Sequence, residues 1–500
     1  MTLTKTDFKE YLLCDKCLWV KKKKPEEYTA GEFSLFLQKL IKDGYEVESY
    51  VQKLFPDGVF VSGNKETLIS KTKALLAGDK HAGTERAGRP IFQATFETDE
   101  GLFAKVDILN FNKEANKWDL YEVKASSEIK TDIKHNHIKD VIFQTIVAED
   151  SGIDIGDSYI IYVNKKYRRA GALDLNKLFI IENITEQVLE QKELVRVEIQ
   201  SALTMLAKDD ISLDGCECLY KSHGQRCDCF FKFNPEVPEY SVHNIVSGNK
   251  LKALLADGIL EVTDIPEDFD LTDKQADKVT LQKIGKPLID KTAIAKTLPE
   301  LVFPIYFLDY ETYGSPIPLL DGYKTNQQIV FQVSVHVLQE DGTLEHFEYL
   351  ANKLEGATRG LVDMLKANIG QVGSVVVWYE SFEKGRNAEL AELHPEDSGF
   401  MEDLNSRVFD LMKVFKKDYL HPDFQGSASI KKVLPVIVPE LSYKSLDVQN
   451  GTMALSEWEK MIKGDMSEGD IEKTKESLLK YCALDTLAMV EIYRKLKEVN

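Results

Sequence analysis

The stretch that decides the fold of the first half of the chain is residues 101–124, GLFAKVDILNFNKEANKWDLYEVK. A partly alternating apolar segment carries Asp107, a polar turn follows, and a second segment carries Glu122 and Lys124. This pattern predicts a β-hairpin. Residues two apart on a strand point to the same face, so Glu122 and Lys124 are expected to lie side by side, with Asp107 next to them.

Two carboxylates on one surface suit a hard divalent cation such as Mg²⁺ or Mn²⁺, which binds through oxygen. Such a metal activates a water and offsets the charge of a scissile phosphodiester. Lys124 is then placed to orient the water or to stabilise the developing charge. The alternative interpretation is a ladder of salt bridges on the surface of a hairpin.

With Asp107 on one strand and Glu-Val-Lys on the next, this segment resembles the core of the PD-(D/E)XK nucleases, in the branch of RecB and the CRISPR-adaptation exonucleases. That branch carries Gly-x-x-[His/Val]-Glu on an upstream helix, which residues 44–48 match. The resemblance implies a further acid at Glu48, with Glu46 as the alternative, and a supporting glutamine at Gln144. It also implies Asp107, Glu122 and Val123 as metal ligands, and it covers about residues 1–230.

Six of the seven cysteines fall in two groups, residues 14–17 and 216–229. Members of the RecB-like branch often hold a four-iron cluster with one N-terminal and three downstream cysteines. The resemblance therefore implies four ligands, which are Cys14, Cys216, Cys227 and Cys229. Cys17 and Cys218 are the alternatives. Four thiolates also suit zinc, and the close Cys-x-Cys pairs depart from the wider family spacing. Three possibilities stay open: a 4Fe–4S cluster, Zn²⁺ or no metal. In each case the cysteines would have a structural role.

A second acid set begins in residues 303–311, FPIYFLDYE, a predicted strand on which Asp309 and Glu311 share a face. Tyr481 and Asp485 are four residues apart on a predicted final helix over residues 471–497, so they also share a face. Three acids and a phenol can bind two metal ions. The alternative is a capping Asp-x-Glu and an ordinary helical pair.

This combination resembles the DnaQ-like 3′–5′ exonucleases of the ribonuclease H fold, in the tyrosine (DEDDy) subclass. Asp309, Glu311 and Thr312 match the first motif, and Tyr481-x-x-x-Asp485 matches the last. The middle motif implies a catalytic Glu383, where the family has aspartate, and Asp410 takes a supporting role. The segment looks like a bacterial domain of unassigned function that is commonly fused to RecB-like nucleases.

A chain of 500 residues is too long for one hydrophobic core. We predict an α/β protein with a restriction-endonuclease-like domain over residues 1–230, a helical connector over 231–300 and a ribonuclease H-like domain over 301–500. No apolar run is long enough to cross a bilayer and the N-terminus lacks a signal peptide's apolar core, which predicts a cytoplasmic protein without a membrane partner.

The net charge of −19 argues against a broadly basic nucleic-acid surface, although lysine clusters such as residues 21–24 can follow a phosphate backbone or simply be solvated. We predict a metal-dependent nuclease with two active sites that hydrolyses DNA in end processing, repair or defence. One alternative is a nucleic-acid-binding protein in which one or both sites are inactive. Another is a 3′–5′ exoribonuclease acting through the C-terminal domain. The oligomeric state stays open.

Overall fold

The computed structural model describes residues 2–29, 31, 33–77 and 88–499 and is a mixed α/β protein. Its chain forms two compact units. The first contains Met1–Glu239, Val246–Gly258 and Pro316–Asn326, and the second contains Tyr240–Ile245, Ile259–Ser315 and Gln327–Asn500. Residues 231–300, predicted as a connector, therefore contribute to both units.

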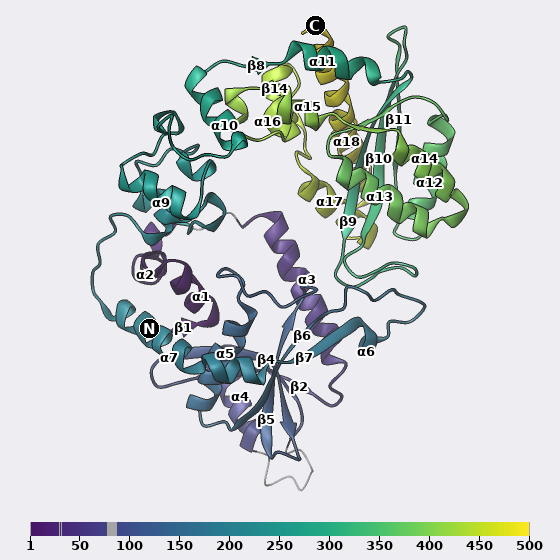
Figure 1. Ribbon diagram of the computed structural model, residues 1–500. Helices are drawn as coiled ribbons and strands as arrows, with labels where there is room; N and C mark the ends of the chain where they lie inside the picture. Colours follow the sequence, from purple (N-terminus) through teal and green to yellow (C-terminus); the bar gives the residue numbers. More distant parts are fainter. Residues whose placement is uncertain (1, 30, 32, 78–87, 500) are drawn as a thin grey trace. The chain divides into compact units, whose positions relative to one another are not determined.

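The first unit is built on a seven-stranded sheet in the order β2-β3-β4-β5-β6-β7, with β1 paired to β4 (Figure 1). The predicted hairpin is confirmed, because β4 and β5 are antiparallel and pair Ile108 with Tyr121. On its other edge β5 pairs in parallel with β6. The strands are β1 (Leu3–Thr4), β2 (Val59–Phe60), β3 (Ile91–Glu97), β4 (Leu102–Asn112), β5 (Lys117–Lys124), β6 (Ile155–Val163) and β7 (Phe179–Asn183).

The first unit also contains nine α-helices within the described residues. Most of its helices lie before residue 55 or between residues 137 and 256. Val47 and Val51 anchor α3 in a core that also contains Ile108 and Ile161. The helices are α1 (Lys5–Leu13), α2 (Asp15–Lys23), α3 (Leu35–Gln52), α4 (Lys65–Ala77), α5 (His137–Asp150), α6 (Leu175–Leu178), α7 (Thr185–Ala207), α8 (Phe230–Phe233) and α9 (Gly248–Ala256).

The second unit is built on a five-stranded sheet in the order β11-β10-β9-β12-β13. The strand β9 is central; it is antiparallel to β10 and parallel to β12. Its mostly buried apolar residues explain this position, since a central strand must be covered on both faces. The strands are β9 (Ile305–Gly314), β10 (Gln328–Leu338), β11 (Leu344–Leu350), β12 (Val375–Val377) and β13 (Val408–Asp410), with a separate ribbon of β8 (Leu288–Ile289) and β14 (Tyr419–Leu420).

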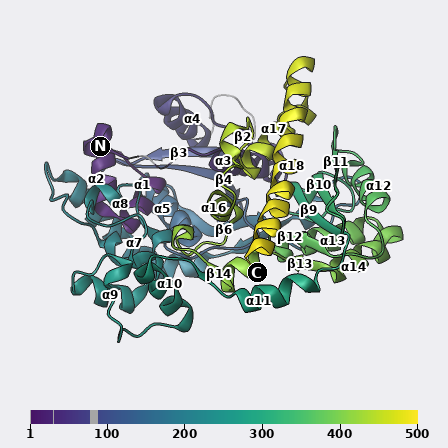
Figure 2. The ribbon, with the colours of Figure 1, turned by 90° about the horizontal axis from the view of Figure 1, so that it is seen from above.

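Helices cover both faces of this sheet. The long helix α18 packs on β9 and β10 on one face of the sheet (Figure 2). The helix α12 packs on β10 on the opposite face, where its residues belong to a second core. Phe307 belongs to the α18 side, where its ring lies 5.8 Å from that of Tyr493. The helices are α10 (Asp273–Ile284), α11 (Lys291–Thr297), α12 (Ala357–Asn368), α13 (Glu380–Leu393), α14 (Ser398–Ser406), α15 (Met412–Lys417), α16 (Ile430–Ile437), α17 (Gly451–Lys463) and α18 (Glu468–Glu498).

The alternation of side chains along β9 decides which face carries the acids. Because Phe307 faces α18, Asp309 and Glu311 point to the same side, while Leu308 and Tyr310 enter the opposite core.

Within the described part of the chain, none of the helices has the length and apolar character needed to span a membrane.

Candidate metal sites

The first acid site forms where β4 and β5 lie side by side, as the hairpin predicted. The Asp107 carboxylate accepts a hydrogen bond of 2.8 Å from the backbone N–H of Val123 and one of 3.2 Å from Gln93 Nε2. Gln93 also donates to Glu48 Oε1 at 2.6 Å. Glu48 on α3 is therefore linked to Asp107 through one shared amide.

Two cations and one amide surround Glu122. Its Oε1 accepts from Lys124 Nζ at 2.7 Å and from Lys5 Nζ at 2.5 Å, and its Oε2 accepts from Gln144 Nε2 at 2.6 Å. Lys124 also binds Asp140 at 2.6 Å. The predicted Glu122, Lys124 and Gln144 thus lie together, and the structure adds Lys5, which no sequence pattern singled out.

Burial and charge push the two central acids of this site in opposite directions. Burial, and next the charge of Glu122, raises the pKa of Asp107 to about 8. Burial also acts to raise the pKa of Glu122, but the ammonium groups of Lys124 and Lys5 outweigh it and hold that pKa well below its usual range. One acid is ionised while its neighbour tends to keep a proton, a division of roles that is common at catalytic sites.

The second acid site brings together residues from β9 and α18. One oxygen from each of Asp309, Glu311 and Asp485 lies within 4.8 Å of the others. Glu311 and Asp485 are buried. The i, i+2 spacing on the strand and the packing of α18 on the same face produce this grouping, as the sequence predicted. Carboxylate oxygens are the donors that Mg²⁺ and Mn²⁺ prefer, so the donor set fits such an ion.

Burial raises the pKa values of the three acids in this group, and repulsion between the acids adds to the rise for Asp309 and Glu311. Burial, and next the charges of Asp485 and Glu311, raises the pKa of Asp309 well above its usual range. Burial raises the pKa of Glu311 to about 8 and that of Asp485 to about 6. A divalent cation would relieve this repulsion, since its charge favours the ionised form of each ligand.

Glu383 and Tyr481, the other two predicted members, also lie near the group. The charge of Glu383 acts on Asp309, and its buried Oε2 has no hydrogen-bond partner among the described residues. Burial raises the pKa of Glu383 to about 8, and Asp410 adds to this rise. The Tyr481 hydroxyl lowers the pKa of Asp485.

Two residues of the second site were missed by sequence reasoning. The hydroxyl of Tyr443 donates to Asp485 Oδ1 at 2.6 Å. The Lys431 ammonium lies 5.8 Å from the Tyr443 ring centroid and 6.0 Å from that of Tyr481, and its charge lowers the pKa of both Glu311 and Asp485. Lys431 lies near the start of α16 and Tyr443 lies in a 3₁₀ turn (Tyr443–Ser445). Both fall between the matched motifs, where spacing gives no indication of proximity.

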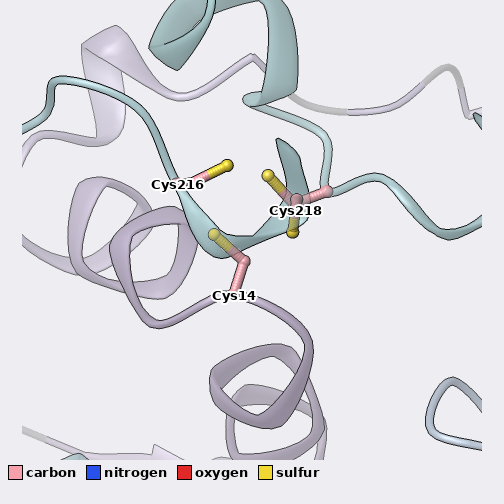
Figure 3. A group of neighbouring side chains, drawn as sticks. Cys14, Cys216 and Cys218 are labelled. Carbon is pink, nitrogen blue, oxygen red and sulfur yellow. The ribbon is translucent and has the colours of Figure 1, made fainter. Parts of the chain in front are cut away.

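The cysteines form a third candidate metal site, in the first unit. The thiols of Cys14, Cys216, Cys218 and Cys227 lie within 4.8 Å of one another and are buried; Figure 3 shows three of them directed toward a common centre. The structure differs from the prediction at one position, because Cys218 takes the place expected for Cys229.

The local backbone explains this exchange. Cys218 lies in a 3₁₀ turn (Glu217–Tyr220) that directly follows Cys216, and this turn directs both thiols to the same place. Cys229 instead caps the short helix α8, and its thiol interacts with Cys17. Four thiols suit zinc or an iron–sulfur cluster.

A buried cation directly precedes Cys227 in the sequence. The three guanidinium nitrogens of Arg226 are buried and have no hydrogen-bond partner among the described residues. The group lies over the rings of Phe230 and Phe231, at 4.2 and 5.4 Å, and burial lowers its pKa.

Contacts near the cysteines join the start of the chain to residues 214–221. Lys221 Nζ donates to the carbonyl of Leu13 at 2.5 Å, and Lys16 Nζ donates to that of Gly215 at 2.8 Å. A metal at the thiols would reinforce a connection that already exists.

Comparison with known proteins gives partial matches. A family model described as "Domain of unknown function (DUF2779)" matches residues 306–429. The "Uncharacterized protein MG366 homolog" of Mycoplasma pneumoniae is 29% identical over 214 residues, which is 39% of this chain and 32% of that protein. "Uncharacterized protein UU173" of Ureaplasma parvum is 26% identical over 218 residues, which is 39% of this chain and 31% of that protein. The chain thus spans about a third of the length of these curated relatives.

The family match begins in β9 and includes Asp309, Glu311 and Glu383, but it ends before Lys431 and Asp485. Neither relative's name states an activity.

Proposed function

We propose that this chain is a divalent-metal-dependent nuclease with two acid sites, a RecB-like PD-(D/E)XK site in the first unit and a DnaQ-like 3′–5′ exonuclease site in the second. The observation that carries the proposal is the meeting of Asp309, Glu311 and Asp485, which distant segments bring within 4.8 Å. Crowding buried carboxylates costs stability, and a metal ion is the simplest reason for a fold to retain them.

In the second site, Asp309, Glu311 and Asp485 would hold Mg²⁺ or Mn²⁺. Such an ion supplies an activated water and offsets charge on the phosphodiester. The chain's own groups have distinct tasks beside it. Tyr443 fixes the orientation of the Asp485 carboxylate through its 2.6 Å hydrogen bond. The cation of Lys431 faces the same acids and is suited to a substrate phosphate.

In the first site, Asp107, Glu122, Glu48 and the carbonyl of Val123 are the proposed ligand set. Lys124 bridges Glu122 and Asp140 and is held there by both. A lysine in that position can orient a water or stabilise charge on the phosphate. The cysteine site would hold a 4Fe–4S cluster or Zn²⁺ as a clasp at the start of the chain.

The proposed substrate is DNA with free or single-stranded ends, in end processing, repair or defence, and RNA is a second candidate for the second unit. The resemblance of the two halves to nucleases supports this substrate class, and the central place of β9 in a five-stranded sheet agrees with a ribonuclease H-like domain.

One observation favours a different function for the first unit, that of binding nucleic acid without cleaving it. Both oxygens of Glu122 are occupied, by Lys5 and Lys124 on one side and Gln144 on the other. Among the described residues, the acids of the first site do not gather as closely as those of the second. A metal at the first site would have to displace part of this network.

A cleavage assay separates the two functions. End-labelled single- and double-stranded DNA and RNA are incubated with Mg²⁺ or Mn²⁺ and the full chain, Glu122→Gln, Asp309→Asn, the double variant or the exposed-acid control Glu340→Gln. We expect each single variant to lose a different activity and the control to retain both. Binding without cleavage by every variant and the parent would overturn the proposal in favour of the binding function.

A further inference from the structure

A pocket of about 430 Å³ opens beside the first acid site. Residues of α3, β2, β3 and β4 line it, among them Glu48 and Gln93, which also belong to that site. Its volume falls in the range of about 300–1,000 Å³ that holds small molecules. The pocket and the acid site therefore share a wall.

Two exposed aromatic side chains line this pocket from different elements. Tyr45 on α3 is 69% exposed and Phe60 on β2 is 57% exposed. Neither ring stacks on another ring within the part of the chain that the structure describes. Large aromatic faces left open beside an acid site are suited to bind a flat ligand ring by stacking.

The pocket also contains one cation. Lys105 is exposed and lies two residues before Asp107 on β4, so both side chains leave the same face of the sheet. Among the described residues it forms no salt bridge. An unpaired ammonium on the face that carries the acids is available for a phosphate.

We infer that this pocket holds an unpaired nucleobase of the substrate strand, stacked against Tyr45 and Phe60, with a flanking phosphate at Lys105. Aromatic rings, a free cation and a neighbouring acid site together match a nucleotide, and stacking accepts any of the four bases. Bases inside a duplex are already stacked and cannot enter. The inference rests on the proposed function of the first site and narrows its substrate to single-stranded or frayed ends.

Photo-crosslinking tests the inference directly. The full chain carrying Glu122→Gln and Asp309→Asn, which blocks cleavage at both proposed sites, is irradiated with a single-stranded oligonucleotide containing 5-iodouracil. The crosslinked peptides are mapped by mass spectrometry. We expect crosslinks at Tyr45 or Phe60, the two rings on which a base would stack.

Affinity for the same oligonucleotide supplies a second measurement. Removing one stacking ring weakens binding by about 5- to 150-fold. We therefore expect Tyr45→Ala and Phe60→Ala to raise the Kd in that range, with Tyr45→Phe and Phe60→Tyr close to the parent. Phe36→Ala is the matched control, because Phe36 is an exposed aromatic on the same helix that does not line the pocket.

The inference is overturned if the crosslinks map only to other residues, or if both alanine variants bind like the parent or like Phe36→Ala. Cleavage by the unmutated chain is measured separately. Crosslinks at Tyr45 or Phe60 without any cleavage would reject the nuclease proposal and keep the pocket. Cleavage with crosslinks only elsewhere would reject the pocket alone.

Discussion

Replacing Glu311 by glutamine is expected to stabilise the metal-free second unit at pH 8. Glu311 is 8% exposed, and burial followed by the charge of Asp485 raises its pKa from 4.5 to about 8. The folded chain therefore holds a proton that the unfolded chain releases. Stability consequently falls as the pH rises from about 4.5 to about 8, and the loss is complete above that range.

Two arguments give the size of this effect. A rise in pKa from 4.5 to about 8 corresponds to about 5 kcal/mol, at about 1.4 kcal/mol per pKa unit. Two ionised carboxylates whose oxygens lie within 4.8 Å of each other repel by about 3.5 kcal/mol or more at an effective dielectric constant of about 20. We expect Glu311→Gln to gain ~2–5 kcal/mol at pH 8 and little near pH 4.5.

The assay is urea unfolding of the EDTA-treated chain at pH 5 and pH 8, followed by tryptophan fluorescence. Hydrogen exchange of peptides from β9 assigns the transition to the second unit. Glu340→Gln removes the same charge from an exposed position and serves as the control. A gain that is equal at both pH values, or equal in the two variants, would refute the reasoning.

Metal addition provides the converse measurement on the same proteins. A ligand at a hundredfold excess over its Kd stabilises a folded protein by about 2.7 kcal/mol. Mg²⁺ should stabilise the parent by an amount of this order and Glu311→Gln by much less. The difference in the free energy of unfolding between the two proteins at pH 8 should then become smaller or change sign.

Three further predictions concern the residues around the metal sites. Tyr443→Phe removes the 2.6 Å hydrogen bond to Asp485, so the pKa of Asp485 should rise and the acidic limb of the pH–rate profile should move to higher pH. Lys431→Met removes a cation that lowers the pKa of two acids, so we expect tighter Mg²⁺ binding by calorimetry together with slower cleavage. Cys218→Ser should lose the metal bound per chain, measured by elemental analysis and absorption, whereas Cys482→Ala should retain it.

The sequence was sufficient where local periodicity decides the structure. The hairpin with Asp107 and Glu122 follows from alternating apolar residues around a polar turn, and the pairing confirms it. The strand with Asp309 and the final helix with Asp485 were equally predictable, because each carries a long periodic pattern. Spacing placed each pair of residues on one face of its element, and the resemblance to DnaQ-like exonucleases supplied the expectation that the two pairs meet.

The residues that were missed contact the sites through long-range packing. Lys5 reaches Glu122 only because α1 begins beside the sheet, and Tyr443 reaches Asp485 from a single 3₁₀ turn (Tyr443–Ser445). The choice of Cys218 over Cys229 depends on a 3₁₀ turn. The spacing of cysteines in the sequence does not predict the direction in which such a turn points a thiol. The loop Pro316–Asn326 likewise joins the first unit, where Ile317 is buried in the core below α3.

The two acid sites differ in how their charge is balanced, and this difference bears on how each would bind metal. Lys5 and Lys124 neutralise Glu122 in the first site, so an ion there must compete with two ammonium groups. In the second site, among the residues that the structure describes, Lys431 is the one cation that lowers the pKa of Glu311 and Asp485, and the acids are left to repel one another. Because a cation gains most where negative charge is least compensated, the second site should bind Mg²⁺ more tightly. A metal titration should therefore show two classes of site, and Lys5→Met should strengthen the weaker class alone.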